Sequence, residues 1–514
     1  DPHEGGFGTK PKFPRPVTLQ FLFRIYARDR QSSMGKHALE MNLFTLRKMA
    51  AGGMHDHLGG GFARYSVDQF WHVPHFEKML YDNAQLAVAY ADAYQITREP
   101  LFAEVTRDIL NYVLRDMTAP EGGFYSAEDA DSVIEHGKPE HAEGAFYVWT
   151  KEQIDAALGA SAEIFNYHYR VEPGGNAPPG SDPHSEFTRK NILIQRHTAA
   201  ETAEHFNKSE AEIRDVLAQT RQTMLELRAK RPRPHLDDKI ITAWNGLMIS
   251  GFARAAQALG APKYVVAAEK AARFLRSHLY DSSQKTLVRN YREGPSAVPG
   301  FADDYAFLIQ GLLDLYEASL DIGWLKFAIE LQETQDRAFF DAENGGYFSG
   351  SGTDPSIVLR LKEDNDGAEP AASSIAALNL LRLSQLRRDD AMRARADQTI
   401  SAFSGILSQI PSAMPQMLVA LEASMSKPRQ IVIAGEPDSD GTRALLAELH
   451  RHYAPNKIII LADGGEGQQF LETALPEIAG MGQVDGKATA YVCENFACQA
   501  PVNEPAALGG LLAG

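Results

Sequence analysis

The sequence predicts a mainly α-helical protein, an (α/α)6 six-hairpin toroid barrel with a small C-terminal α/β lobe. Glycine pairs followed by an aromatic residue recur at Gly5, Gly60, Gly122 and Gly345. The first three lie roughly 60 residues apart, a period that fits two helices and a loop. Strand-like stretches without the glycines, RKNILIQR and KTLVRNY, fall in the long interval before Gly345 and bring the number of repeat turns to six.

Between these turns, segments combine helical periodicity with polar, Gly or Pro ends. We expect helices over residues 17–30, 36–52, 81–97, 100–116, 209–230, 241–260, 262–280, 301–320, 323–340, 369–388, 390–408 and 414–425. Six consecutive hairpins can close into a ring with an inner and an outer layer of helices. The alternative is an open helical-repeat array, whose period is usually shorter.

The tail of the chain has a different pattern. Residues 428–465 predict a strand, a loop, an amphipathic helix and a second strand, which together make a βαβ unit, and ATAYVCENFACQAPV adds another strand. We therefore expect two domains, a barrel over residues 1–427 and an α/β lobe over residues 428–514. The turn AGEPDSDG lacks the glycines and the lysine of nucleotide-binding loops, so we expect no cofactor.

Composition excludes several classes of partner. The 514-residue chain is 44% hydrophobic and has a formal net charge of −16, which opposes broad contact with nucleic acid or with anionic membranes. Apolar runs such as KIIILA are too short to span a bilayer. Two cysteines are too few for a secreted disulfide framework, so we expect a cytoplasmic protein. Cys493 and Cys498 could form a local disulfide, bind a metal with distant ligands or, most simply, fill space.

Polar clusters mark the starts of the expected inner helices. The segments are HFEKMLYDNAQLA, HLDDKIITAWNGLM, PGFADDYAFLIQG and RLKEDNDGAEPAASS. Equivalent positions in a closed ring converge on one mouth of the barrel. Helix capping explains any single Asp or Asn. It does not explain the aromatic residues and the histidine beside them, which suit sugar hydroxyls and ring faces: Trp71, His75, Tyr81, Trp244 and Tyr305.

Two further clusters carry chemistry. Glu128, Asp129 and Asp131 follow a glycine turn. Glycoside cleavage uses a pair of carboxyl groups, one as acid and one as base or nucleophile. A solvated loop or a cation site is the alternative. The histidines His55, His57, His72 and His75 have irregular spacings without a zinc motif, so we expect no metal. As acid and base they would suit epimerisation of open-chain sugars, and hydrogen-bonded structural histidines are the alternative.

Long stretches of the chain resemble a known family. They are GGFGTKPKFP, AAGGMHDHLGGGFARYSVDQFWHVPHFEKMLYDNAQL, SAEDADS, EGAFYVWT, RPHLDDKIITAWNGLMISGFARA, FADDYAFLIQGLLDLYEASL, LKEDNDGAEPAASS and CENFACQAPV. The family is the thioredoxin-like-domain (DUF255) family of the spermatogenesis-associated protein 20 type. The resemblance implies an N-terminal thioredoxin-like domain, expected to be absent from this chain, followed by a barrel similar to six-hairpin glycosidases and N-acylglucosamine epimerases.

These observations lead to one leading hypothesis, a barrel that binds a sugar or sugar-like polyol and, if it is an enzyme, acts as a glycoside hydrolase or a sugar epimerase. The alternative is a non-catalytic binding or scaffold module that works with a thioredoxin-like domain. The expected catalytic residues are His75, Asp82, Glu128, Asp238 and Asp304. The expected substrate-binding residues are His72, Glu77, Asn83, Asp129, Lys239, Trp244, Asn245, Asp303, Tyr305, Glu363 and Asp366.

Overall fold

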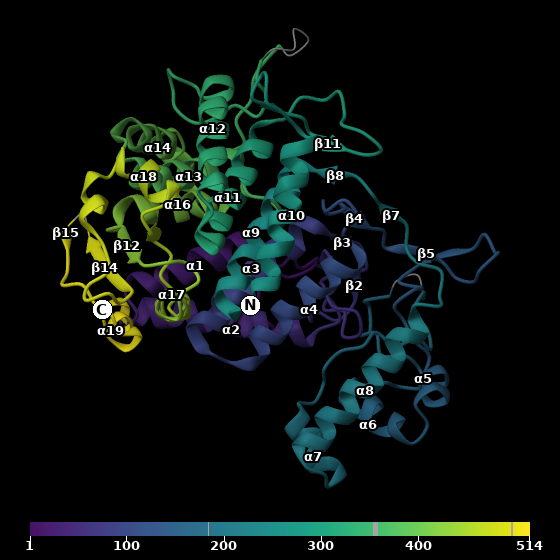
Figure 1. Ribbon diagram of the computed structural model, residues 1–514. Helices are drawn as coiled ribbons and strands as arrows, with labels where there is room; N and C mark the ends of the chain where they lie inside the picture. Colours follow the sequence, from purple (N-terminus) through teal and green to yellow (C-terminus); the bar gives the residue numbers. More distant parts are fainter. Residues whose placement is uncertain (183–184, 353–357, 495–496, 514) are drawn as a thin grey trace.

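The computed structural model describes residues 1–182, 185–352, 358–494 and 497–513 (Figure 1). Six inner helices form a ring in which each contacts the next and the last contacts the first. They are α1 (Pro16–Arg28), α3 (Leu80–Thr97), α9 (Thr242–Leu259), α11 (Ala302–Ser319), α13 (Ala372–Arg387) and α16 (Pro415–Met425). Helices α3, α9 and α11 bury most of their residues on every side, as a helix enclosed by others must.

An outer layer covers the ring. Each of the first five inner helices is followed by an outer helix that packs against it. These are α2 (Ser33–Ala51), α4 (Pro100–Asp116), α10 (Pro262–His278), α12 (Ile322–Phe339) and α14 (Asp390–Ala402). Their exposed and buried positions alternate with helical period, so one face meets the inner layer and the other meets solvent. The predicted fold class, an (α/α)6 barrel with a small α/β lobe, is confirmed.

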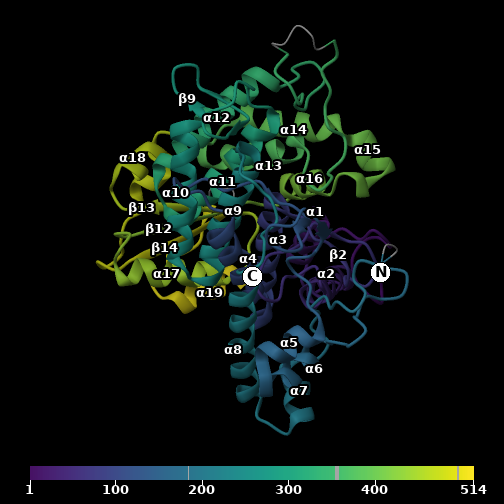
Figure 2. The ribbon, with the colours of Figure 1, turned by 90° about the vertical axis from the view of Figure 1, so that its right-hand side faces the viewer.

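One predicted helix forms but lies outside the ring. The segment expected over 209–230 is α8 (Glu210–Arg228), and it packs against α5 (Lys151–Leu158), α6 (Ala162–His168) and α7 (Ala199–Phe206). We call α5–α8 the projecting lobe, which extends away from the ring in both ribbon views (Figures 1 and 2). Its small separate core includes Ile213, Leu217 and Met224 of α8. The sixth inner helix, α16, has no outer helix after it among the described residues. The short helix α15 (Ser404–Gln409) lies between α14 and α16.

Short antiparallel ladders connect the hairpins near the start of the inner helices. The strands are β1 (Tyr65–Ser66), β2 (Pro74–His75), β3 (Lys78–Met79), β4 (Ala127–Glu128), β5 (Asp131–Val133), β6 (His141–Glu143), β7 (Leu236–Asp237), β8 (Ile240–Ile241), β9 (Tyr280–Asp281), β10 (Thr286–Leu287) and β11 (Asn290–Tyr291). The pairs are β1 with β2, β5 with β6, β8 with β11 and β9 with β10, and β3, β4 and β7 form one sheet in that order. These ladders fix the loops that lead into α3 and α9.

The C-terminal lobe has a four-stranded sheet in the order β13-β12-β14-β15. Strands β12 (Arg429–Ala434) and β13 (Lys457–Ala462) are parallel, and β14 (Thr489–Glu494) and β15 (Ala497–Cys498) are antiparallel to their neighbours. Helices α17 (Asp440–Arg451) and α19 (Pro505–Ala513) pack on one face of the sheet, and α18 (Glu466–Glu472) follows β13. The other face shares the core of the ring through Val432, Ile458 and Ile460.

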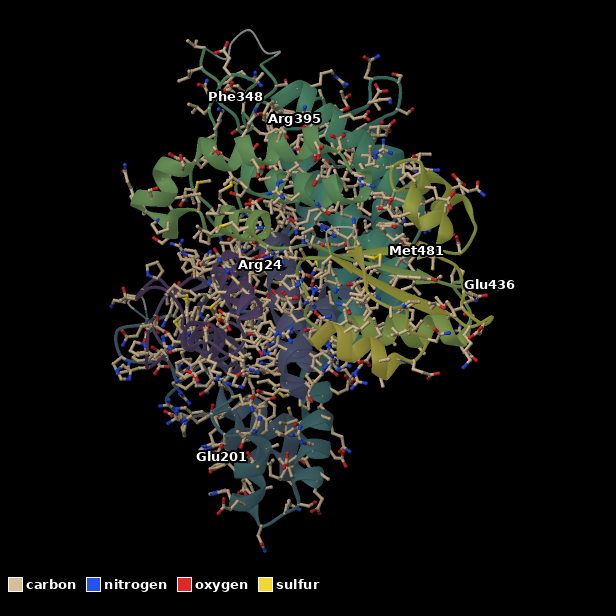
Figure 3. All side chains as sticks on the ribbon, turned by 90° about the vertical axis from the view of Figure 1, so that its left-hand side faces the viewer. Arg24, Glu201, Phe348, Arg395, Glu436 and Met481 are labelled. Carbon is tan, nitrogen blue, oxygen red and sulfur yellow. A yellow bond between two sulfur atoms is a disulfide. The ribbon has the colours of Figure 1, made fainter. Side chains whose placement is uncertain are left out.

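Two covalent or charged links belong to this lobe. Cys493 and Cys498 are paired across β14 and β15 in a disulfide, so the local disulfide is the one of the three sequence alternatives that the structure contains. Arg24 of α1, labelled in Figure 3, joins ring and lobe by donating to Glu422 of α16 and to Asn456 before β13. None of the described helices combines the length and the apolarity needed to cross a membrane.

The repeated glycine–aromatic turns are held by polar side chains of the inner helices. Phe62 N–H donates to Asn83 Oδ1 (2.8 Å), and Asn83 Nδ2 donates back to the Phe62 carbonyl (3.1 Å). Asn245 holds Phe124 in the same way at 2.8 and 2.9 Å. Ser373 plays this part at Tyr347 (2.9 Å for the Tyr347 N–H bond). The side-chain amides of Asn83 and Asn245 thus have all their hydrogen bonds with the backbone. Their recurrence in the sequence reflects this structural role, not ligand binding.

Replacing Gly60 by alanine is expected to lower the free energy of unfolding by about 2–3 kcal/mol. Gly60 has φ +76°, and a Cβ there would lie 2.3 Å from the backbone oxygen of Asp108. Gly260 is the matched control, because it also has positive φ (+60°) but nothing within 4 Å of its Cβ position. Gly260→Ala should cost about 1 kcal/mol. Urea unfolding of both variants tests this, and equal losses would contradict the close approach at Gly60.

Candidate functional site

The first turns of α3, α9 and α11, together with the loop before α13, bring acidic, basic and aromatic side chains together at one end of the ring. We call this group the mouth. Successive members are linked by direct contacts or by electrostatic influence on one another's pKa. Its members are Arg64, Glu77, Tyr81, Asp82, Trp244, Arg289, Asp303, Glu363 and Glu369. Glu363 is exposed, and Trp244, Asp303 and Glu369 are partly exposed, so the group reaches solvent.

Asp82 is the deepest carboxyl group of the mouth. It lies in the first turn of α3, is 3% exposed, and its Oδ2 atom has no hydrogen-bond partner among the described residues. Burial raises the pKa of Asp82 well above its ordinary value, and the charges of Glu369 and Glu77 add to the shift while Arg64 opposes it. The raised pKa favours the protonated form of Asp82, which is the form that can donate a proton.

Glu369 is the second carboxyl group with a shifted pKa. Trp244 Nε1 donates a hydrogen bond of 2.7 Å to Glu369 Oε2, and the rings of Trp244 and Tyr81 meet edge to face at 4.9 Å. Burial, followed by the charge of Asp303, raises the pKa of Glu369 to about 7. Glu369 is thus close to half ionised at neutral pH, and the mouth holds a proton donor and a proton acceptor together.

Two guanidinium groups flank the carboxyls. Arg64 donates to Glu77 at 3.1 Å. Arg289 pairs with Asp303 at 2.6 Å and with Asp304 at 2.9 Å. Both arginines are therefore already neutralised by carboxylates of the protein, and they stiffen the mouth more than they offer charge to a ligand.

Asp304 is held differently from the other acids. It is fully buried, and its oxygens accept hydrogen bonds from the backbone N–H groups of Ala243 (2.9 Å) and Phe301 (2.8 Å) as well as pairing with Arg289. Burial and the charge of Asp303 raise the pKa of Asp304 to about 8, and Arg289 opposes the shift. These hydrogen bonds join the start of α9 to the start of α11, so Asp304 has a structural role.

His75 lies at the rim of the mouth. Its Nδ1 is 2.8 Å from Glu143 Oε1, its Nε2 is 3.9 Å from Glu77 Oε2, and its ring stacks on Tyr65 at 5.0 Å. The hydrogen bond with Glu143 raises the pKa of His75. The imidazole is therefore oriented by a carboxylate and faces the Arg64–Glu77 pair.

Several predicted residues lie outside the mouth. Glu128 is buried in another cluster, where Tyr112 and Arg233 each donate to it at 2.8 Å. His72 is buried near Asp68, and burial lowers its pKa. Three other predicted residues contact protein groups outside the mouth. Asp129 accepts from Asp131 N–H, Asp238 pairs with Arg292, and Lys239 pairs with Asp237.

Two more predicted residues are used by the backbone. Asp366 accepts from the N–H groups of Ala371 and Gln416 and so links the starts of α13 and α16. The hydroxyl of Tyr305 accepts from Leu287 N–H at 2.8 Å. Of the sixteen predicted residues, the mouth and its rim bring together His75, Asp82, Glu77, Trp244, Asp303 and Glu363, with Asp304 directly behind them.

The prediction missed Arg64, Arg289 and Glu369. The arginines lie in loops with no helical pattern, and the folding of each loop brings them to Glu77 and Asp303, which lie 13 and 14 positions further along the chain. Glu369 stands inside the segment RLKEDNDGAEPAASS, but nothing in its neighbours distinguishes it from Glu363. Across the described part of the chain, no group of three or more His, Cys, Asp or Glu residues could hold a metal ion.

Comparison with known proteins gives a clear relationship at the level of sequence. The chain is 42% identical to human spermatogenesis-associated protein 20 over 531 residues, which cover 100% of this chain and 67% of the human protein. An uncharacterized protein of Caenorhabditis elegans is 38% identical over 519 residues, covering 98% of this chain and 70% of that protein. The chain belongs to the spermatogenesis-associated protein 20 family. No protein-family profile matches it.

Solved structures with related folds are much more distant from this family member. Cellobiose 2-epimerase from Bacillus thermoamylovorans is 8% identical with a TM-score of 0.48, over 82% of this chain and 93% of that one. A glycoside hydrolase family 76 mannosidase from Bacteroides thetaiotaomicron is 10% identical with a TM-score of 0.43, over 80% and 86% of the two chains. Similarity at this level does not bear on the chemistry of the mouth.

Proposed function

We propose that the mouth binds a sugar or sugar-like polyol and cleaves a glycosidic bond with two carboxyl groups. The observation that carries the proposal is Asp82, a buried carboxyl with a raised pKa and an unpartnered oxygen, near Glu369, whose pKa is raised to about 7. Glycoside hydrolysis needs such a pair, one group as acid and one as base or nucleophile. Trp244 and Tyr81 supply ring faces for the apolar side of a sugar.

In the proposed reaction Asp82 gives its proton to the glycosidic oxygen as the bond from that oxygen to the anomeric carbon breaks. Glu369 takes a proton from the water that attacks the anomeric carbon, and Trp244 Nε1–H holds the carboxylate in place. The products are two hydroxyl compounds, and proton exchange with solvent restores both acids. The two carboxyls have different roles because their environments differ. Asp82 is buried, whereas Glu369 is partly exposed.

Epimerisation is less well supported than hydrolysis. It would need a base that removes a proton from carbon, and the imidazole nearest to the mouth, His75, lies at the rim and is bonded to Glu143. The carboxyl pair is central and the histidine is peripheral. We therefore place glycoside cleavage first.

Thermal melting with a panel of mono- and disaccharides tests the proposal. A ligand at about a hundred times its Kd should add about 2.7 kcal/mol to the free energy of unfolding. Glu369→Gln should keep ligand binding but lower the release of reducing ends at least about 100-fold, because the amide cannot accept the proton. The matched control is Glu333→Gln, an exposed glutamate on outer helix α12, which should change neither.

Two results would contradict the proposal. Full turnover in both Asp82→Asn and Glu369→Gln would exclude the carboxyl pair as the reacting groups. A folded wild-type protein that no sugar stabilises would favour the alternative function, a non-catalytic scaffold that works with a thioredoxin-like domain.

A further inference from the structure

The balance of charge in the mouth is uneven. Five of its members are carboxyl groups and two are guanidinium groups. Asp304, directly behind the mouth, adds a further carboxyl that shares Arg289 with Asp303. Because burial favours the protonated forms of Asp82 and Asp304 and the arginines pair with Glu77 and Asp303, the negative charge left for a ligand is that of Glu363 and of the ionised form of Glu369.

Both arginines are already paired with carboxylates of the protein, although the buried Nε of Arg64 has no hydrogen-bond partner among the described residues. Arg64 is engaged with Glu77, and Arg289 is engaged with Asp303 and Asp304 at 2.6 and 2.9 Å. A phosphate or carboxylate on a ligand would have to displace one of these carboxylates, and the displaced group would then lose its own partner. The arrangement disfavours phosphorylated sugars and sugar acids.

Three carboxyls of the mouth have no cationic partner. Neither Asp82, Glu363 nor Glu369 takes part in an ion pair among the described residues. The Oδ2 atom of Asp82 is buried and unpartnered, so it could accept or donate one hydrogen bond to a polar group that is not part of the protein. Glu369 raises the pKa of Asp82, and Glu363 raises that of Glu369, so the three side chains act on one another.

An ammonium group fits this arrangement better than a hydroxyl does. It donates three hydrogen bonds, and carboxylates such as Glu363 and Glu369 accept charge-assisted bonds from it. Trp244, whose Nε1 is bonded to Glu369, and Tyr81 beside it present aromatic rings that attract a cation. A carboxylate and an aromatic face side by side make a receptor for an amine.

We infer that the mouth selects amino sugars, with the protonated amine on Glu363 and Glu369 and the ring hydroxyls directed toward Asp82. This inference rests on the proposed function and names the substrate class of the same site. Neutral sugars keep the hydroxyl contacts but lose the ion pair. N-acetylated and phosphorylated sugars lose the cation or add an opposing charge.

The test is calorimetric titration of the full chain at pH 7.5, above the pKa of about 7 of Glu369, with glucosamine, glucose, N-acetylglucosamine, glucosamine 6-phosphate and the polyamine putrescine. We expect glucosamine to bind about 10-fold tighter than glucose or N-acetylglucosamine, and the phosphate to cancel the gain. The preference should shrink with added salt, because it is electrostatic. In Glu369→Gln the ratio of glucosamine to glucose affinity should fall toward one, while Glu333→Gln should keep it.

The outcomes separate this inference from the proposed function. If neutral sugars bind and glucosamine binds no tighter, the inference is overturned and the proposed function stands. If no compound in the set binds, both fail. If putrescine binds as tightly as glucosamine, the mouth recognises charge alone, which overturns the assignment to sugars. Should Glu369→Gln not fold, judged by circular dichroism, the order of affinities in the wild-type protein decides the question.

Discussion

Replacing Asp56 by alanine is expected to lower the free energy of unfolding by about 3–5 kcal/mol, because it removes the carboxylate with which two buried cations pair. Lys78 Nζ donates to Asp56 at 2.8 Å, and Arg228 binds it with both terminal nitrogens at 2.7 and 2.8 Å. All three side chains are less than a tenth exposed. Burial alone would raise the pKa of Asp56, but Arg228 and Lys78 hold it well below its ordinary value.

The contacts of Asp56 also join two parts of the molecule. Lys78 belongs to β3 at the entry to α3, and Arg228 is the last residue of α8 in the projecting lobe. Loss of Asp56 should therefore loosen the lobe before the ring. Urea unfolding measures the energy, and limited proteolysis within α8 measures the local opening.

The matched control for this prediction is Glu135→Ala. Glu135 pairs with Lys138 on the surface, where both side chains are more than half exposed, so its loss should change the free energy of unfolding by less than about 1 kcal/mol. A loss below about 1 kcal/mol for Asp56→Ala as well would mean that Lys78 and Arg228 find water or other partners, contrary to the expected cost.

The ring was predictable from the sequence because its repeat has a physical cause. The glycine–aromatic turns at Phe62, Phe124 and Tyr347 put the ring into the core and the backbone against a polar side chain of an inner helix, as Asn83 does for Phe62. These turns therefore leave a recognisable glycine–aromatic pattern in the sequence. The same fact explains why Asn83 and Asn245 looked like site residues, since a buried amide at a helix start serves a turn as well as a ligand.

In the projecting lobe, hydrophobic periodicity predicts the helix correctly but not its position in the fold. Helix α8 has an apolar stripe and a capping box at Ser209, and these features predict a helix without saying what it packs against. Only five of its nineteen residues are buried, whereas α9 buries fourteen of eighteen. Its low apolar content was the available signal that it does not belong to the inner layer.

The site was predictable only in part. Residues in the first turns of inner helices, such as Asp82 and Trp244, converge on the mouth because the ring makes equivalent positions neighbours. Arg64, Arg289 and Glu369 come from loops, and their approach depends on how each loop is folded, which repeat phase does not determine. The pKa of Glu369 depends on burial and on Asp303, about 66 positions away in the chain, so no local pattern records it.

Lowering the pH from 7 to 5 is expected to remove about 4 kcal/mol of stability through two buried histidines, His55 and His168. They are 6% and 5% exposed, and their Nδ1 atoms lie 3.1 Å from the Ala50 carbonyl and 3.2 Å from Thr202 Oγ1. Burial lowers the pKa of His55 to about 4 and that of His168 to about 3. In the unfolded chain both take up a proton near pH 6.5.

The sign of the effect follows from these values. Between about pH 6.5 and pH 4 the unfolded state binds more protons than the folded state, so stability is present above pH 6.5 and is lost as the pH falls. Each histidine contributes about 1.4 kcal/mol per pH unit within that window, or about 2 kcal/mol by pH 5. The raised pKa values of Asp82, Glu369 and Asp108 act in the opposite direction, because the folded state holds those protons.

A comparison of variants isolates the histidine contribution from these opposing carboxyls. Urea unfolding of wild type and His168→Asn at pH 7 and pH 5 should show that the variant loses about 2 kcal/mol less than wild type between the two pH values. His37→Gln is the control, because the side chain of His37 is 70% exposed and should leave the pH dependence unchanged. Equal losses in wild type and His168→Asn would mean that His168 is protonated in the folded protein, and that its burial beside His57 and Thr202 does not exclude the charge.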